Sequence, residues 1–169
     1  DVYKRQGQNH ESTPMSLLEL PAFATAAPTL REAALKLRTS ESSVTIAASL
    51  DEPGIFASAL LEASLLDAGI PYQRRLRDNP QAAKGPSIVI NSTPVSELES
   101  IGTDPLNIHL APLEVEALVA SGGDSRRGLL STVALAAALG HSISPSGPLS
   151  RLLMPWILAG NWLSSGLEH

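Results

Sequence analysis

Acid, amide, hydroxyl and imidazole side chains follow three predicted strands of this chain, and their types and spacing could support chemistry. They lie in the segments Ser49–Gly54, Asn91–Pro94 and His109–Pro112. In an open parallel sheet the ligand site lies beyond the carboxyl ends of the strands, so these segments would meet at one edge. The groups available there are those of Asp51, Glu52, Asn91, Ser92, Thr93 and His109.

This set of side chains is too small for a site that binds two metal ions. Two dications about 4 Å apart need several carboxylates to neutralise them. Asp51 and Glu52 are adjacent, and adjacent side chains of an extended segment point to opposite faces. The chain has no cysteine, which excludes disulfides, zinc–thiolate sites, iron–sulfur clusters and cysteine nucleophiles. GxGxxG, Walker A and GxSxG motifs are also absent from the sequence.

The apolar pattern predicts the elements that must position these residues. Helices are expected over Thr29–Arg38, Ile55–Ala68, Gly128–Leu139 and Leu149–Leu163, and strands over Val44–Ser49, Ile70–Arg77, Ser87–Ile90 and Leu106–Leu110. Thr29 and Glu32 have the spacing of a capping box. Leu113–Ala120 is expected to be helical or irregular, and Ser121–Arg127 a loop. The order predicts an α/β domain with a mainly parallel sheet of about four to five strands flanked by helices.

Composition excludes several classes of protein. The chain has 169 residues, 43% of them apolar, which favours a folded domain over a disordered chain. The net charge of −5 gives no global basic surface for nucleic acid. No stretch reaches the roughly 18 to 20 apolar residues of a membrane span, and no signal peptide is recognisable. A cytoplasmic protein is therefore expected.

Four segments of the chain resemble, in order and separation, the motifs of the DHH phosphoesterase superfamily, in particular its RecJ-like branch. The strand that ends in Ser49-Leu-Asp-Glu-Pro-Gly54 resembles the first motif, His-x-Asp-x-Asp-Gly. Ile88–Asn91 resembles the strand that ends in aspartate, and Ile108–Pro112 resembles the Asp-His-His-x-Pro motif. Gly160–Ser164 resembles a later helix with glycine and aspartate. The resemblance implies an α/β fold of the RecJ-like N-terminal type.

The same resemblance implies that the metal site has degenerated. The metal-site positions of the family correspond here to Ser49, Asp51, Pro53, Asn91, Ile108, His109, Leu110 and Ser164. Only Asp51 and His109 keep the family's residue types. Family members bind divalent metal ions, usually manganese, but amide, proline and aliphatic side chains do not supply the charged oxygens that hard cations need. No catalytic residue and no bound metal is therefore expected.

A degenerate DHH protein has a known kind of role, which the resemblance extends to this chain as an expectation. The replicative helicase of archaea and eukaryotes contains a RecJ-derived subunit that has lost catalysis and bridges the GINS complex and the MCM motor. We therefore expect a pseudoenzyme of archaeal type that acts as a scaffold in DNA replication or repair. Its expected partners are replisome proteins such as GINS or MCM, with at most weak contact to single-stranded DNA.

Two other functions fit the sequence. A divergent phosphoesterase or single-strand-specific exonuclease could still use Asp51 and His109 with manganese and with ligands from sequence outside this chain. An unrelated small Rossmann-like binding domain would need neither residue for catalysis.

Structural interpretations of the same residues compete with the functional ones. Asp51 lies just before a predicted helix, where an acid is more often a helix cap than a metal ligand. His109 lies on an apolar strand, where a histidine is more often part of the core. Asn91 follows a strand, where an asparagine usually forms a turn. Arg74, Arg75 and Arg77 could contact DNA or an acidic partner, but they are more typical of a solvated edge strand.

The two ends of the chain are expected to lie outside the domain. Asp1–Gln6 resembles a translated sequencing adapter, so residues 1–14 are interpreted as a disordered leader and Met15 as the natural start. A single domain is expected over 15–164, truncated at its C-terminus, with a tail over 165–169.

Overall fold

The computed structural model describes residues 16–98, 100–103, 106–117 and 126–163. The predicted leader over 1–14, the tail over 165–169 and Ser164 lie outside the described residues. Two short 3-10 helices, η1 (Leu17–Glu19) and η2 (Pro21–Phe23), open the described part of the chain.

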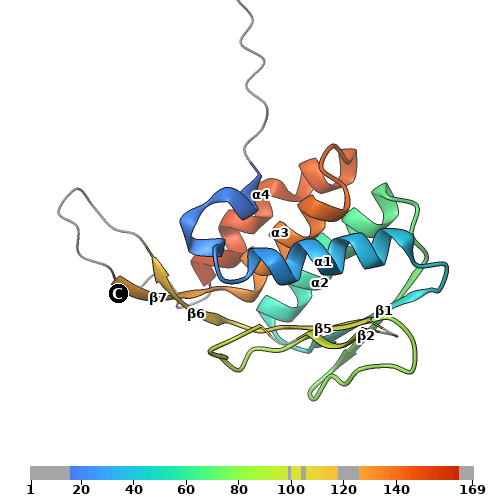
Figure 1. The fold of residues 1–169 in the computed structure, drawn as a ribbon, viewed down its shortest axis with the longest axis horizontal. Coiled ribbons are helices and arrows are strands. Elements are labelled where there is room, and N and C mark those ends of the chain that lie inside the picture. Colours follow the sequence, from blue (N-terminus) through green and yellow to red (C-terminus); the bar gives the residue numbers. More distant parts are fainter. Residues whose placement is uncertain (1–15, 99, 104–105, 118–125, 164–169) are drawn as a thin grey trace, which may run out of the picture.

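A five-stranded sheet forms the base of the fold (Figure 1). Its strand order is β2-β1-β3-β5-β4. The strands are β1 (Val44–Ser49), β2 (Tyr72–Arg77), β3 (Ser87–Ile90), β4 (Ser100–Thr103) and β5 (Leu106–Leu110). Strands β2, β1, β3 and β5 are parallel, and β4 pairs antiparallel with β5. The predicted α/β class with a mainly parallel sheet is confirmed.

The central strands β1 and β3 consist of short runs of small and β-branched residues, and every residue of both strands is buried. Such continuous runs are typical of parallel strands in the middle of a sheet. The bounds of β1, β3 and β5 agree with the sequence prediction. Strand β2 is an edge strand and is mostly exposed, in agreement with its arginines.

The four α-helices of the described ranges lie on one side of the sheet (Figure 1). They are α1 (Ala27–Thr39), α2 (Glu52–Asp67), α3 (Thr132–Ile143) and α4 (Pro148–Leu163). Helices α2 and α3 approach closely because small residues line their contact: a Cβ added to Gly140 would collide with Ser64 Oγ. None of the helices in the described ranges is long and apolar enough to cross a membrane.

The first two helices start earlier than predicted. Helix α1 begins at Ala27 with Pro28 in its first turn, so Thr29 lies inside the helix and the predicted capping box is wrong. Helix α2 begins at Glu52, with Asp51 as its N-cap, and Gly69 with φ 69° follows its C-terminus as predicted.

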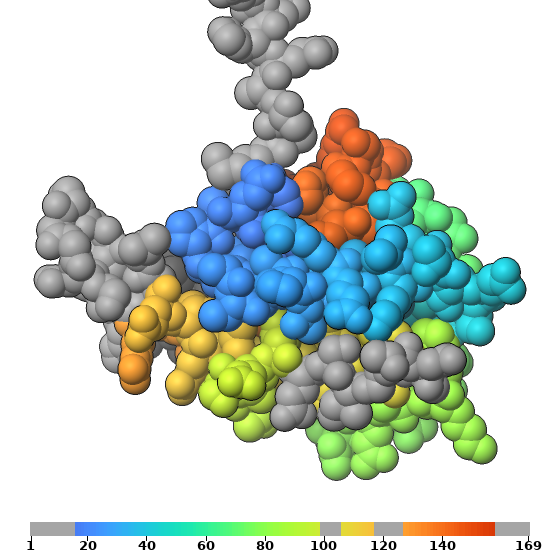
Figure 2. Space-filling view, viewed as in Figure 1, coloured from blue at the N-terminus to red at the C-terminus, as the bar shows by residue number. Residues whose placement is uncertain are grey.

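The two faces of the sheet differ in chemistry. Ile46, Ile88 and Ile108 face the helices and are fully buried in the core. The opposite face carries two rows of residues that align across β2, β1, β3 and β5. The first row is Gln73, Thr45, Ser87 and Asn107, and the second is Arg75, Ala47, Val89 and His109. The connection from β2 to β3 passes on this second side, in green below the sheet in Figure 1 and below helix α1 in Figure 2. Among the described residues, no helix covers this polar face.

The segment after β5 forms a hairpin that the sequence did not predict. β6 (Leu113–Ala117) pairs antiparallel with β7 (Arg126–Leu130). The expected helical or irregular structure over Leu113–Ala120 and the helix start at Gly128 are therefore wrong. Leu113 and Val115 are buried while Glu114 and Glu116 are exposed, which is the period of a strand. Strand β4 was also not predicted.

Candidate functional site

Polar groups from β1 and β3 meet where these neighbouring strands end. Ser49 Oγ donates to Asp51 Oδ1 at 2.8 Å, and Ser92 Oγ donates to Asp51 Oδ2. The two hydroxyl oxygens lie 3.3 Å apart. The chain leaves β1 for β2 on one side and β3 lies on the other, so this is the point at which the strand order reverses. In open α/β sheets, ligands bind in the crevice at such a point.

Asp51 is used as the N-cap of α2. Its Oδ1 accepts a hydrogen bond of 2.8 Å from the Gly54 amide, and its backbone carbonyl accepts one of 3.0 Å from the Ile55 amide. Position 54 accommodates only glycine without a shift of the backbone, because a Cβ there would overlap the carbonyl oxygen and Oγ of Ser49. The predicted interpretation of Asp51 as a cap is confirmed, and Pro53 occupies the first turn that the cap begins.

The Asp51 carboxylate is stabilised in its charged form. Burial by itself would raise the pKa of this carboxyl, but hydrogen bonds from Ser92, the Gly54 amide and Ser49 outweigh it and hold the pKa below its ordinary value. A bound anion at this helix start would meet a negative charge that already accepts the available donors. The start of α2 is therefore unsuited to phosphate, although helix N-termini in general attract it.

A second helix begins at the same edge of the sheet. Thr132, the first residue of α3, donates from Oγ1 to the Asn91 carbonyl at 3.1 Å, and the Asn91 amide donates to the Leu110 carbonyl at 2.8 Å. Ser131 caps α3 by accepting a 3.1 Å hydrogen bond from the Ala134 amide. Asn91 is therefore fixed at the end of β3 by backbone contacts to β5 and α3, and its side chain is left to face a pocket.

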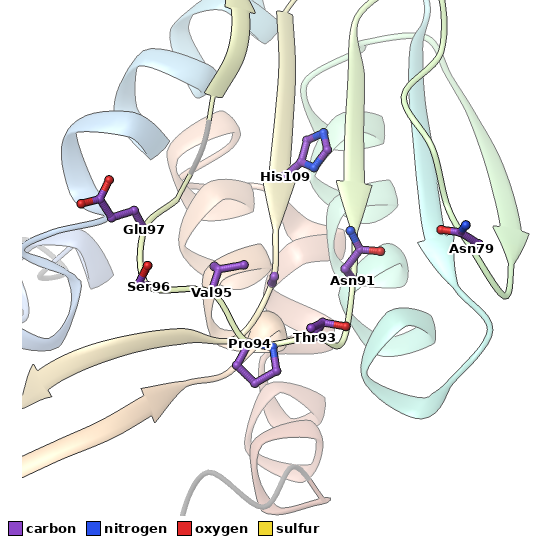
Figure 3. Close-up of a pocket in the computed structure, with 9 residues that line it drawn as sticks. Asn79, Asn91, Thr93, Pro94, Val95, Ser96, Glu97 and His109 are labelled. Atoms are coloured by element: carbon purple, nitrogen blue, oxygen red, sulfur yellow. The ribbon is translucent and has the colours of Figure 1, made fainter.

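The pocket lies on the polar face of the sheet and has a volume of about 620 Å³. Figure 3 shows His109 on β5 and Asn91 at the end of β3, with Asn79 reaching in from the β2–β3 connection. The chain after β3 contributes Thr93, Pro94, Val95, Ser96 and Glu97, and Ala111 follows the end of β5. The wall is thus mostly uncharged and offers amide, hydroxyl and imidazole groups for hydrogen bonding.

Among the described residues that line this pocket, the geometry brings no acid–base pair together. Glu97 and His109 point away from each other on opposite sides of β5 (Figure 3). General acid–base catalysis needs such groups within hydrogen-bond reach of the reacting atoms. Recognition of a polar surface or molecule needs only the hydrogen-bonding groups that are present.

The residues of this edge do not fit the two manganese ions that the DHH resemblance would imply. Ile108 and Leu110 are fully buried in the core, where they have no donor atoms to offer. Asn91 is neutral, and both Asp51 oxygens accept hydrogen bonds within the protein. Within the described ranges, no three His, Asp or Glu side chains are grouped so that they could bind a metal ion.

His109 is not a core residue, which corrects one expectation. Its neighbours Ile108 and Leu110 point into the core, so His109 points to the polar face and lines the pocket, half-buried. The topology does bring Ser49, Asn91 and His109 onto adjacent strands near the same edge, as the sequence predicted.

The three arginines of β2 divide between the two faces of the sheet. Arg74 lies on the helix side and pairs with Glu62 of α2 at 3.0 Å. Arg75 lies on the polar face beside Ala47 and donates to Gln73 Oε1 at 3.3 Å, and Arg77 aligns with Ser49. They therefore form no single basic cluster, which agrees with the interpretation of β2 as a solvated edge.

Sequence reasoning missed the residues that reach the site from connections and from α3. Asn79, Ser96 and Glu97 lie in segments without regular structure, and no local pattern indicates which face such segments cover. The start of α3 did have a signal, because Ser131-Thr132 directly precedes an apolar run and serine is a favoured N-cap.

Comparison with known proteins found no matching protein-family model, no similar curated protein and no similar solved structure. The DHH resemblance accordingly stays a prediction.

Proposed function

We propose that this chain is a catalytically inactive relative of the RecJ-like DHH phosphoesterases that acts through binding rather than hydrolysis. One observation carries the proposal. Asp51, which matches a metal ligand of the family, accepts hydrogen bonds from Ser49, Ser92 and Gly54 as a helix cap. A carboxylate engaged in this way contributes to folding, and the positions around it lack the charged oxygens that would complete a metal site.

The proposed role is that of a scaffold in DNA replication or repair, with replisome proteins of the GINS or MCM kind as partners. This part rests on the family resemblance. The net charge of −5 also favours protein partners over a nucleic-acid backbone. The described surface includes exposed apolar side chains on α4, among them Leu152 and Trp156, as expected for a subunit that contacts other proteins.

The proposal is tested by a nuclease assay and a binding assay on the same preparation. End-labelled single-stranded DNA incubated with the chain and manganese chloride should stay intact, while purified GINS or MCM proteins should be retained by the immobilised chain. Manganese-dependent cleavage that disappears in Asp51→Ala would contradict the proposal and support a divergent phosphoesterase. Failure to retain either partner would contradict the scaffold role.

A second candidate function is a small binding domain unrelated to the DHH proteins. The strand order β2-β1-β3-β5 favours it, because open parallel sheets in proteins of many functions share this order. Its ligand would be uncharged and polar, since Asp51 disfavours anions at the switch point and the pocket beside it offers amides and hydroxyls. Absence of replisome binding together with saturable binding of a neutral polar compound would support it.

A further inference from the structure

A second surface surrounds the turn between α3 and α4, at the opposite end of α3 from the sheet edge. A pocket of about 300 Å³ lies between α2, α3 and α4 on one side of this turn. Another of about 450 Å³ lies on its other side, between the C-terminal ends of α1 and α3 and the residues that follow α2. Both pockets include Ser144, Pro145 and Ser146.

The smaller pocket has an apolar wall. Leu60, Ala137, Met154 and Ile157 line it, and Leu60 and Ala137 are buried while Met154 is 45% exposed. A flexible methionine at the mouth of an apolar pocket adapts to the shape of an inserted side chain. The volume is at the lower end of the range of ligand pockets and is sufficient for a large apolar side chain.

Among the described residues that line the two pockets, the formally charged side chains are both arginines. Arg151 and His141 line the smaller pocket, and Arg38 lines the larger one. No Asp or Glu occurs among the described residues that line them, and in the described part of the chain neither arginine forms an ion pair.

The nearby acid Asp67 is already engaged. Its carboxylate accepts hydrogen bonds from the Leu149 amide at 3.2 Å, the Ser150 amide at 2.9 Å and Ser150 Oγ at 2.8 Å. It therefore joins the end of α2 to the start of α4 and fixes the wall of the smaller pocket. Its negative charge stays at the rim of this pocket, so an acidic segment must bind through the two arginines, which form no ion pair within the described residues.

We propose that this surface, defined by the two pockets and Arg38, His141 and Arg151, binds an acidic peptide segment of a partner protein. An apolar side chain of the peptide enters the pocket between α2, α3 and α4, and flanking carboxylates pair with Arg151 and Arg38. Buried apolar anchors surrounded by charged contacts are typical of peptide recognition. The inference deepens the proposed scaffold role, on which it rests, because it names the chemistry of the partner.

The test is fluorescence anisotropy with a short fluorescein-labelled peptide of glutamate, aspartate and leucine. The full chain should bind it with micromolar affinity, and a peptide with lysine in place of the acids should not bind. Arg151→Glu should weaken binding by about tenfold or more. Ser146→Trp, at an exposed lining position, should block the mouth of the pocket and also weaken binding.

The matched control is Arg31→Glu, which makes the same charge change at an exposed position of α1 away from both pockets. It should leave the affinity unchanged. Equal losses in Arg31→Glu and Arg151→Glu would overturn the proposal, because the attraction would then be non-specific. Binding of the lysine peptide, or of decanoate without any binding of the acidic peptide, would also overturn it.

Failure of this inference can be told apart from failure of the scaffold role. If the chain retains GINS or MCM proteins and Arg151→Glu retains them equally, the scaffold role holds and this surface is not the one used. If the chain cleaves DNA with manganese, the scaffold role fails, and the peptide titration still decides whether the surface binds acidic segments.

Discussion

The sheet edge at Asp51 and the surface around the α3–α4 turn both carry charged groups, but they use them differently. At the sheet edge the Asp51 carboxylate accepts hydrogen bonds from Ser49, Ser92 and the Gly54 amide. At the turn, Arg38 and Arg151 line pockets and, among the described residues, make no ion pair. The polar groups of the first region are used within the fold, whereas the two arginines of the second make no ion pair within the described residues.

This difference shows why residue identity is a poor guide to function. Asp51 is the residue that the sequence suggests as a metal ligand, yet its hydrogen bonds are those of a helix cap. Arg151 matches no motif, yet it stands at the mouth of an apolar pocket. What separates the two residues is whether the protein itself already satisfies their polar atoms.

The largest expected effect comes from Gly54→Ala. The new Cβ would overlap Ser49 and Asp51, so the start of α2 must move away from the end of β1. We expect the free energy of unfolding to fall by about 2–3 kcal/mol, as for overpacking of a close contact. Urea denaturation followed by circular dichroism measures it. Gly85→Ala is the matched control, because no atom lies within 4 Å of its added Cβ; a similar loss in both variants would contradict the role given to Gly54.

The next effect is the loss of the Asp51 cap. Asp51→Ala should lower the free energy of unfolding by about 1 kcal/mol, and Asp51→Asn by less, because asparagine also caps helices. Denaturation curves of the two variants and the wild-type chain provide the comparison. If both variants lost the same amount of stability, and more than about 1 kcal/mol, the negative charge of Asp51 rather than its capping hydrogen bond would be the main stabilising factor.

The pH dependence of stability tests the same group. The pKa of Asp51 is lowered in the folded protein, so its carboxylate stabilises the fold above its ordinary pKa, and this contribution disappears as the pH falls from about 4 through the lowered pKa. Asp51→Asn should therefore lose less stability than the wild type on acidification. The pKa of Asp67 is also lowered, because its hydrogen bonds from Ser150 and Leu149 outweigh the effect of burial. Asp51→Asn should therefore keep part of the acid-dependent loss of stability that the wild type shows. Identical acid profiles for Asp51→Asn and wild type would contradict the assignment.

Asp67→Ala should have a more local effect on stability, confined to the region around the α3–α4 turn. This change removes the acceptor for the Leu149 and Ser150 amides at the start of α4. Loss of a helix cap costs about 1 kcal/mol, here confined to α4 and its contacts. Hydrogen exchange should speed up at the Leu149 and Ser150 amides and stay unchanged in β1 and β3. Faster exchange throughout the sheet would show that α4 is part of the global folding unit.

The smallest effect on stability is expected at the edge strand β2, which carries the arginines. Arg74→Ala removes a partly exposed ion pair with Glu62, and such pairs contribute about 0.2–1 kcal/mol. We expect a change below about 0.5 kcal/mol and no change in affinity for the acidic peptide. Thermal denaturation in low and high salt checks the first expectation. A large loss of stability that high salt does not reduce would indicate that Arg74 also packs against α2.

The sequence was most informative where burial alone decides structure. β1, β3 and β5 were placed correctly because their short apolar runs admit few alternatives, and the cap at Asp51 followed from an acid before proline and glycine. β6 and β7 were missed because Leu113–Ala117 is short and its alternation is weak evidence without its partner strand. Asn79 and Glu97 reach the pocket only through tertiary arrangement, and local sequence does not encode that.

The most direct measurement is a manganese titration of the full chain followed by isothermal calorimetry. Because the Asp51 oxygens are engaged and Ile108 and Leu110 lie in the core, we expect no saturable heat at micromolar manganese, in the wild type and in Asp51→Ala alike. Saturable binding of manganese that is lost in Asp51→Ala would show that the carboxylate still serves a metal ion, and would contradict the inactive role of this edge.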